Sequence, residues 1–569
     1  MASIRYLAVT AALALAAPAA AQPVQHDHRA PAAEAAPMPG VPASLADWAK
    51  GARIFPGLGN FHRQVTTRSP EAQAYFDQGM RFIWAFNHDE ATRSFAKAAE
   101  IDPTCAACYW GVALTLGPNY NMPMMAEARA QVGWEAYEKG RIAAAKASPV
   151  EQALIEAVGK RYSGPRPIDP SNSRPVLAAY VAAMRQIADR FPADMDVQTL
   201  YAEALMNTNP WKLWKPDGTP GPGTPDILAA LQRVLAKDPT HPGANHYWIH
   251  AVEASPHPER ALHSAELLTG MMPAAGHLEH MPAHILQRVG RYEEAAEANR
   301  KGAAADLAYL GETAPPDYYP MYLIHNFQFL AYSAAMEGRR EESVEATRKV
   351  MAAAPEAMLL TMPGLDWSVG YVYDSMIRFG LWADLLKEKA PNPKLAGLTI
   401  AWLQGQANAL AATGKPSEAK AMAAQAGQLI ATTAPDARQG MNSARSLYEI
   451  GQLRAEARIA LAERRTADAI AALRDAAARE DGIAYDEPSD FFFPIRHQLG
   501  AVLLSAGHAA EAEAVYRDDL ARHPHNGWAL FGLAKALAAE KKSRAAATAR
   551  TQFAGAWKHA DVQLTSSAY

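Results

Sequence analysis

Apolar and small residues along residues 72–103 follow the pattern of two successive helices. Gly79 is small, Phe82 and Phe95 are aromatic, and Pro103 follows the second apolar stretch. In such a pattern small residues let two helices approach, aromatic side chains fill the space between them, and proline ends the second helix. The segment is therefore predicted to form a helix–turn–helix unit.

The same spacing recurs along most of the chain, which indicates a repeat array. Further units end at Pro192, Pro239, Pro273, Pro355 and Pro524. Pattern matching gives about eight or nine units over residues 70–560, some of them degenerate. The sequence resembles the tetratricopeptide repeat superfamily over nearly its whole length. This resemblance implies an all-α fold, a right-handed α-solenoid of helix pairs whose first helices line a concave groove.

The start of the chain has the features of an export signal. Arg5 precedes a short apolar stretch, and small residues at 19–21 precede Gln22, so residues 1–21 are predicted to be a cleavable signal peptide. The apolar stretch is too short to span a bilayer, so we do not expect an integral membrane protein. The mature protein is expected to be periplasmic or secreted. Residues 22–60, rich in Ala and Pro, are predicted to be a linker.

The repeat array is expected to have two parts. Residues 61–390 form an N-terminal array with a histidine-rich groove and two loop insertions, and residues 391–569 form a C-terminal array.

Composition narrows the possible functions. The 569 residues are 49% hydrophobic, which excludes a disordered chain. Lys and Arg total 55 against 59 Asp and Glu. The chain therefore has no excess of positive charge that would attract the phosphate backbone, and no nucleic-acid partner is expected. No phosphate-binding loop, dinucleotide fingerprint, serine nucleophile motif or HExxH motif is evident.

Histidines concentrate between residues 241 and 284, where eight of the chain's 18 occur. His246 and His280 are 34 residues apart, and so are His250 and His284. Within each pair, the spacing of four residues puts both side chains on one face of a helix, where they can bind one ion. Because adjacent repeats stack, the two pairs are predicted to lie side by side on the groove wall.

The same repeat frame adds further ligand types. Glu203 and Glu253 align with the histidine pairs as additional ligands or as a general base, and His277 and His325 are expected at the rim. Such nitrogen and oxygen ligands suit a transition metal, Cu, Zn or Fe, better than Mg²⁺ or Ca²⁺. The sequence therefore predicts a transition-metal site of unknown metal identity.

Pro282 complicates this arrangement. Proline fits the first turn of a helix, which puts His280 at or just before a helix start and so changes its direction relative to His246. The alternative is a metal-free histidine wall that binds a peptide or makes structural hydrogen bonds.

Two insertions flank the histidine-bearing repeats. Equivalent positions of neighbouring repeats are 47 residues apart from Met195 to Pro242 and 48 residues apart from Gly276 to Ile324. Both distances are longer than one repeat. Because long loops in a compact array are commonly functional, we expect aromatic flaps over the groove. The candidate aromatic residues are Trp211 and Trp214 in the first insertion and Tyr318 and Tyr319 in the second.

Two signals lie outside this region. Cys105 and Cys108 form a CxxC without the histidine of a haem attachment motif, and a local disulfide is favoured over a redox-active or metal-binding pair. A second polar patch, expected to be solvated or to cap a helix, consists of Tyr485, Glu487, Arg496 and His497.

The histidine block resembles one in a group of bacterial exported tetratricopeptide proteins. Its residues read HPGANHYWIHAVE and, further on, GHLEHMPAHI. We hypothesise a metal site in the groove that binds or activates a small organic or peptide ligand. Metal-assisted hydrolysis and copper- or iron-dependent oxidation both remain open. The alternatives are a metal-free scaffold for envelope proteins and a periplasmic metal carrier.

Overall fold

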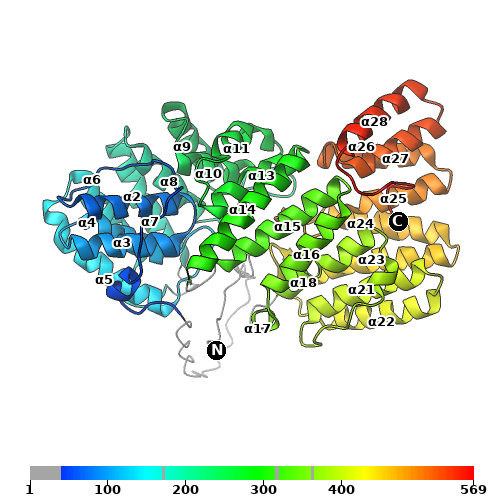
Figure 1. Ribbon diagram of the computed structural model, residues 1–569, viewed down its shortest axis with the longest axis horizontal. Coiled ribbons are helices and arrows are strands. Elements are labelled where there is room, and N and C mark those ends of the chain that lie inside the picture. Colours follow the sequence, from blue (N-terminus) through cyan, green and yellow to red (C-terminus); the bar gives the residue numbers. More distant parts are fainter. Residues whose placement is uncertain (1–39, 169–172, 314, 316–318, 361–363) are drawn as a thin grey trace, which may run out of the picture.

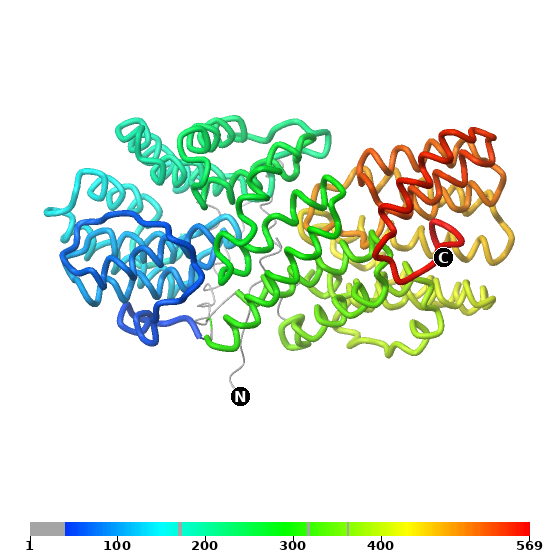
Figure 2. The backbone as a smooth tube through the Cα atoms, turned by 45° about the horizontal axis from the view of Figure 1, so that its top comes forward, coloured from blue at the N-terminus to red at the C-terminus, as the bar shows by residue number. Residues whose placement is uncertain are grey.

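The computed structural model describes residues 40–168, 173–313, 315, 319–360 and 364–569, and these form an elongated succession of helices. Helices up to α14 lie at one end, helices from α21 on lie at the other, and α15 and α16 run between them (Figure 1). The backbone tube in a second orientation shows the same division (Figure 2). The predicted signal peptide, residues 1–21, lies outside the described residues.

The named elements in the described part of the first half are all helices. Its elements are α1 (Leu45–Ala49), α2 (Pro70–Trp84), α3 (His88–Ile101), α4 (Ala106–Leu116), α5 (Glu127–Ala143), η1 (Ala144–Lys146), α6 (Pro149–Val158), η2 (Gly159–Arg161), α7 (Ser173–Arg190), α8 (Met195–Met206), α9 (Thr224–Lys237), α10 (Pro242–Val252), η4 (Pro258–Ala261), α11 (Leu262–Leu268), α12 (Gly276–His280), α13 (Pro282–Arg288) and α14 (Tyr292–Glu312).

The second half adds one short hairpin to its helices. Its elements are α15 (Pro320–Met336), α16 (Arg340–Ala353), α17 (Glu356–Leu359), α18 (Leu365–Val369), α19 (Tyr371–Arg378), α20 (Trp382–Leu385), α21 (Ala396–Ala412), α22 (Pro416–Thr432), β1 (Arg438–Gln439), β2 (Asn442–Ser443), α23 (Ala444–Ala462), α24 (Thr466–Glu480), α25 (Ile495–Ser505), α26 (Ala509–Arg522), α27 (Gly527–Ala539) and α28 (Ser543–Ala556). The predicted all-α fold class is confirmed for the described residues, and none of their helices is long and apolar enough to cross a membrane.

Successive helices pack as pairs, which is the arrangement that the repeat pattern predicts. Pairs include α2 with α3, α15 with α16, α21 with α22, α23 with α24, and α27 with α28. Short turns join the partners, and Gly338 and Gly507 adopt the left-handed backbone conformation that ends the first helix of their pairs.

A glycine–aromatic–glycine contact fixes the spacing of neighbouring pairs. A Cβ built on Gly79 or on Gly111 would lie 2.5 or 2.4 Å from the ring of Phe95. Near the other end of the chain, Tyr516 lies between Gly500 and Gly532 in the same way, at 2.4 and 2.1 Å. The ring on the second helix therefore packs directly on the backbone of its own first helix and of the next one.

Gly500→Ala is expected to destabilise the protein by about 1–3 kcal/mol, because the added methyl group would overlap the Tyr516 ring in a packed core. The measurement is chemical denaturation. Gly427→Ala is the matched control, since a Cβ there meets nothing within 4 Å and alanine favours helix. Equal stability of the two variants would contradict the role of this contact.

The predicted linker is part of the fold from about residue 45 onwards. Within the described part, α1 buries Trp48 completely, and the Gln78 side chain accepts a hydrogen bond from the Phe55 backbone at 2.7 Å. The expected linker boundary at residue 60 therefore differs from the structure. Residues 22–39 of that segment lie outside the described residues.

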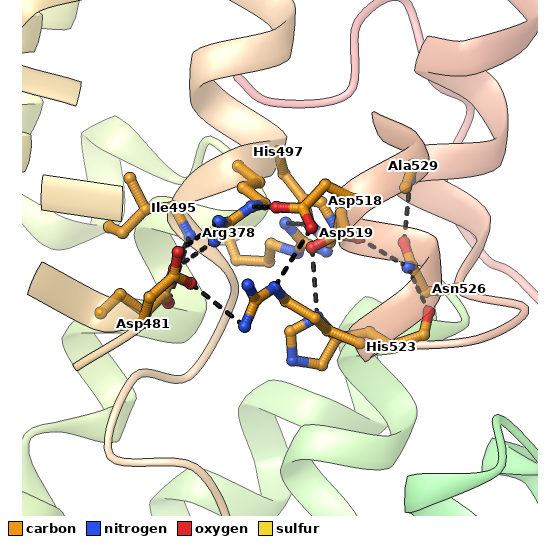
Figure 3. Close-up of polar contacts among 12 residues, drawn as sticks. Arg378, Asp481, Ile495, His497, Asp518, Asp519, His523, Asn526 and Ala529 are labelled. Atoms are coloured by element: carbon orange, nitrogen blue, oxygen red, sulfur yellow. Dashed lines mark hydrogen bonds and ion pairs between the residues drawn. The ribbon is translucent and has the colours of Figure 1, made fainter. Parts of the chain in front are cut away.

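A buried polar chain joins three helices of the C-terminal half (Figure 3). Arg378 of α19 donates from Nη1 to His497 Nδ1 of α25 at 2.9 Å, and His497 Nε2 donates to Asp519 Oδ2 of α26 at 2.8 Å. All three side chains are at most 2% exposed. His497 is thus a structural core residue, and the solvated position expected for it is wrong.

Candidate metal centre

Helix α10 carries the first histidine pair. His241 caps the helix by accepting a hydrogen bond from the Ala244 backbone, and Pro242 occupies the first turn, where its missing N–H costs nothing. His246 and His250 follow one turn apart, with ring centroids at 5.0 Å. Both side chains are buried.

His280 and His284 form the second pair across the junction of α12 and α13. Met281 keeps helical backbone angles, and Pro282 occupies the first turn of α13. The Nε2 atoms of His280 and His284 are 2.6 Å apart. Pro282 therefore does not turn His280 away from His284.

Six histidines and two glutamates gather into three groups of possible metal ligands. Within each group the candidate ligand atoms all lie within 4.8 Å of one another. The groups are His246, His250 and His277; His280, His284 and His325; and His250, Glu253 and Glu487. His277 and His325 were expected at the rim. Instead, His277 is only 3% exposed and joins the first pair, while the His325 side chain is 13% exposed and joins the second.

Hydrogen bonds at Nδ1 orient the rings. His246 Nδ1 donates to the Trp84 carbonyl at 2.6 Å, and His280 Nδ1 donates to Asn299 Oδ1 at 2.6 Å. Within the described residues, Nε2 of His246 and Nε2 of His250 have no hydrogen-bond partner. An imidazole fixed through one nitrogen presents the other as a ligand, which is the usual arrangement around protein-bound metals.

Glu253 lies between the two histidine pairs. Its Oε1 is 2.9 Å from His250 Nδ1, and its Oε2 is 2.6 Å from His284 Nδ1. Glu487 approaches from the C-terminal half, with Oε2 3.0 Å from His284 Nδ1 and 4.0 Å from His325 Nε2. The cluster thus combines residues from both predicted arrays.

A small hairpin holds the segment that carries Glu487. Asn442 at the start of β2 donates to the Ala484 carbonyl at 3.0 Å and accepts from the Ala484 backbone N–H at 2.8 Å. Asp486 Oδ2 accepts from the Met441 backbone at 3.2 Å. These bonds fix the chain just before Glu487 and direct its carboxylate towards the histidines.

Burial keeps most of the imidazoles neutral. Burial, reinforced by neighbouring histidines, holds the pKa of His246, His277 and His280 well below its ordinary value. Burial also lowers the pKa of His250 and His325. Neutral imidazole is the form that binds metal ions, so these five rings need lose no proton to do so at neutral pH.

The nearby carboxylates raise the pKa of one of the imidazole rings, that of His284. Burial alone would lower the pKa of His284, but Glu487 and Glu253 outweigh it and raise that pKa to about 10. Burial and the charge of Glu253 raise the pKa of Glu487 to about 8. The pKa of Glu253 is held well below its usual range because His250 and His284 outweigh the effect of its burial.

A small, partly open cavity adjoins the cluster and has room for about two water molecules. Four of the clustered histidines line it, namely His250, His277, His284 and His325. Aromatic and aliphatic side chains, two amides and two carboxyl groups form the rest of the wall. These residues are Trp211, Met321, Tyr322, Ile324, Leu365, Asn121, Gln328, Asp486 and Glu487. Four of the clustered histidines therefore face one partly open cavity.

One of the four predicted flap aromatics reaches this cavity. Trp211 lines it, with its ring centroid 6.2 Å from that of His250. Trp214 instead donates its indole N–H to the Ala251 carbonyl, and Tyr319 is buried with its hydroxyl on Asp306 at 2.7 Å. Neither is among the described residues that line the cavity. Tyr318 lies outside the described residues.

Glu203 does not join the cluster. Its Oε1 accepts from Asn207 at 2.5 Å, and it belongs to none of the three ligand groups among the described residues. Burial raises its pKa, and Arg161 opposes that effect. Glu203 therefore lies outside the ligand groups found among the described residues, and its role as a general base stays a prediction.

Cys105 and Cys108 are joined by a disulfide where α4 begins. Cys105 is the N-cap residue, and its sulfur accepts a hydrogen bond from the Cys108 backbone at 3.2 Å. Both residues are fully buried.

Glu487 is the functional candidate that sequence reasoning placed elsewhere. It was grouped with Arg496 and His497, its near neighbours in sequence. In the structure, Arg496 forms ion pairs with Asp481 and Asp518, at 2.6 Å in each case. Glu487 instead contacts His284 of the histidine cluster. No short-range pattern connects residue 487 with residues 246–325, so only the tertiary fold reveals this contact.

Comparison with known proteins identifies similar architectures only. No protein-family model and no curated protein matches the chain. The similar solved structures are tetratricopeptide-repeat proteins. A chain of the APC/C hetero-tetramer Cut9–Hcn1 is 12% identical, with 86% of this chain and 90% of that one covered and a TM-score of 0.28.

Two further structures give similar values. Human IFIT1 is 12% identical over 87% of this chain and 91% of its own, with a TM-score of 0.30. Yeast Tom70 is 10% identical over 84% and 90%, with a TM-score of 0.27. All three scores are low, so the assignment of a tetratricopeptide-like fold rests on the helix pairs and glycine–aromatic contacts described above.

Proposed function

We propose that this helical-repeat protein binds a transition metal, Zn, Cu or Fe, in its buried histidine cluster and uses it to bind a small ligand. The observation that carries the proposal is the orientation of the imidazoles, with His246, His250 and His280 each held through Nδ1. A buried polar atom without a partner costs about 1–3 kcal/mol. A metal ion would satisfy the unpaired Nε2 atoms of His246 and His250 together.

The adjoining cavity supports a small ligand. Met321, Ile324 and Leu365 line it together with polar groups, which is a common composition for small-molecule sites. The cavity has room for about two water molecules, so only a small group of an organic or peptide ligand fits.

Reaction and location are further parts of the proposal. A metal bound by three histidines keeps an open position, where it can activate water for hydrolysis or bind oxygen for copper or iron oxidation. Export through residues 1–21 would place the protein in the periplasm or outside the cell. The helical-repeat surface would then be available to an envelope protein partner.

Elemental analysis tests the metal proposal. The wild-type protein, purified from its native compartment, is expected to contain at least about one equivalent of Zn, Cu or Fe. The variant with His246, His250, His280 and His284 all replaced by Ala is expected to lose it, with helix content checked by circular dichroism. His257→Ala is the matched control, because that histidine belongs to the same sequence block but its side chain is 70% exposed.

A wild-type protein that stays metal-free after reconstitution with Zn²⁺, Cu²⁺ and Fe²⁺ would overturn the proposal. Metal that stays bound to the folded quadruple variant would overturn the assignment of the ligands.

A further inference from the structure

The clustered histidines form two separate triads. The first triad is His246, His250 and His277, and the second triad is His280, His284 and His325. No residue belongs to both. The two triads adjoin, because the ring centroids of His250 and His284 are 5.6 Å apart and those of His277 and His280 are 5.8 Å apart.

Six imidazoles are more than one ion of the proposed kind uses. Histidine nitrogens bind Zn²⁺ at about 2.0–2.1 Å, and catalytic sites typically take three protein ligands and one exchangeable position. Each triad supplies three such ligands within 4.8 Å of one another. We infer that the cluster holds two metal ions, one in each triad, an inference that rests on the proposed metal-binding function.

Glu253 links the two positions. Its two carboxylate oxygens contact Nδ1 of His250 in the first triad and Nδ1 of His284 in the second, at 2.9 and 2.6 Å. One carboxylate therefore orients a ligand of each ion, which makes Glu253 a positioning residue shared by both. Glu253 also brings negative charge to a site that would hold two cations, and Glu487 adds a second carboxyl group that such cations would help to ionise.

The third ligand group does not add an independent position. It consists of His250, Glu253 and Glu487, and His250 already belongs to the first triad. It brings both carboxylates within 4.8 Å of a first-triad ligand.

The cavity lies against both triads. His250 and His277 of the first triad line it together with His284 and His325 of the second. A small ligand there would lie near both triads, with Met321 and Leu365 also in the wall. The ligand class that fits is a small molecule, or a small terminal group, with an oxygen or nitrogen donor.

Metal stoichiometry tests the inference. The metal-free full-length protein is titrated with Co²⁺, and bound metal is measured by elemental analysis and by visible absorption. The wild type is expected to bind two equivalents. The variant His246→Ala with His277→Ala is expected to keep one, and so is the variant His280→Ala with His325→Ala. His257→Ala, with its exposed side chain, should bind two.

The outcomes separate this inference from the proposed function. No bound metal in the wild type overturns both. One equivalent in the wild type, or loss of all metal in either folded double variant, overturns the two-ion centre and leaves the proposed function standing. If a double variant fails to fold, EPR of the Cu²⁺-loaded wild type decides: spin coupling between neighbouring ions is expected, and an uncoupled signal overturns the inference.

A further variant tests the role of Glu253. Glu253→Gln is expected to change the Co²⁺ absorption of both ions and to weaken both positions by about 10- to 100-fold, as loss of an orienting hydrogen bond does elsewhere. An unchanged spectrum at either position would overturn the shared positioning role.

Discussion

Glu487→Gln is expected to weaken metal binding by about 10- to 100-fold, although residue 487 is far in sequence from every histidine of the cluster. Its carboxylate contacts His284 Nδ1 at 3.0 Å and approaches His325 Nε2 at 4.0 Å. Glutamine keeps the side-chain volume but cannot ionise, whereas a bound cation would favour the ionised form of the Glu487 carboxyl group, so the effect is electrostatic. The measurement is a competition titration against a chelating dye.

The matched control for this substitution is Glu259→Gln. Glu259 is close to the histidine block in sequence and contacts His257, but its side chain is 53% exposed. Its replacement is expected to leave the affinity unchanged. Equal affinities of Glu487→Gln and the wild type would show that the C-terminal half does not contribute to the metal site.

Asp519→Asn is expected to destabilise the C-terminal helices by about 3–5 kcal/mol, the usual cost of leaving a buried charge without a compensating opposite charge. Burial lowers the pKa of Arg378 to about 9, and the charge of Asp519 is the largest influence opposing that shift. Without it, the buried Arg378 cation keeps its hydrogen bond to the neutral ring of His497 and its position over the Trp528 ring, but no longer has the nearby negative charge (Figure 3). Denaturation followed by hydrogen exchange in α25 and α26 measures the effect.

The dependence of this effect on pH follows from the pKa of Asp519. Burial alone would raise it, but His497 and His523 outweigh burial and hold it below its ordinary value. The stabilisation by the ionised carboxylate is therefore complete above about pH 4, the pKa of an unfolded aspartate, and is lost as the pH falls further. The difference between wild type and variant should shrink only in strong acid.

Asp518→Asn is the control for this experiment. Asp518 is the neighbouring residue and pairs with Arg496 at 2.6 Å, but its side chain is 47% exposed. Such a pair contributes about 0–1 kcal/mol. Equal losses from Asp518→Asn and Asp519→Asn would contradict the importance of the buried chain.

Local patterns were enough to predict the helix pairs. Gly79 and Phe95 are one repeat's own residues, and their contact follows from spacing within a single helix–turn–helix unit. The pairing of His246 with His250 follows from one turn of helix in the same way. Such contacts recur wherever the short-range pattern recurs, so one sequence contains the information needed to find them.

Contacts between distant segments were not predictable in this way. Glu203 shares a repeat position with the histidines, yet the fold places it beside Asn207 and near Arg161. Trp214 lies in the expected insertion, but its indole N–H donates a hydrogen bond to the Ala251 carbonyl of α10. These positions depend on how an insertion folds against its neighbours, for which the repeat frame gives no rule.

The order of the ligands along the chain has a consequence for biogenesis. The histidines occupy residues 246–325, whereas Glu487 follows only after α16 to α24 and depends on the β1–β2 hairpin for its position. A chain that is still being synthesised therefore exposes the histidines well before the last carboxylate is available. Complete metal loading would be a late step in maturation, after the second half has packed onto the first.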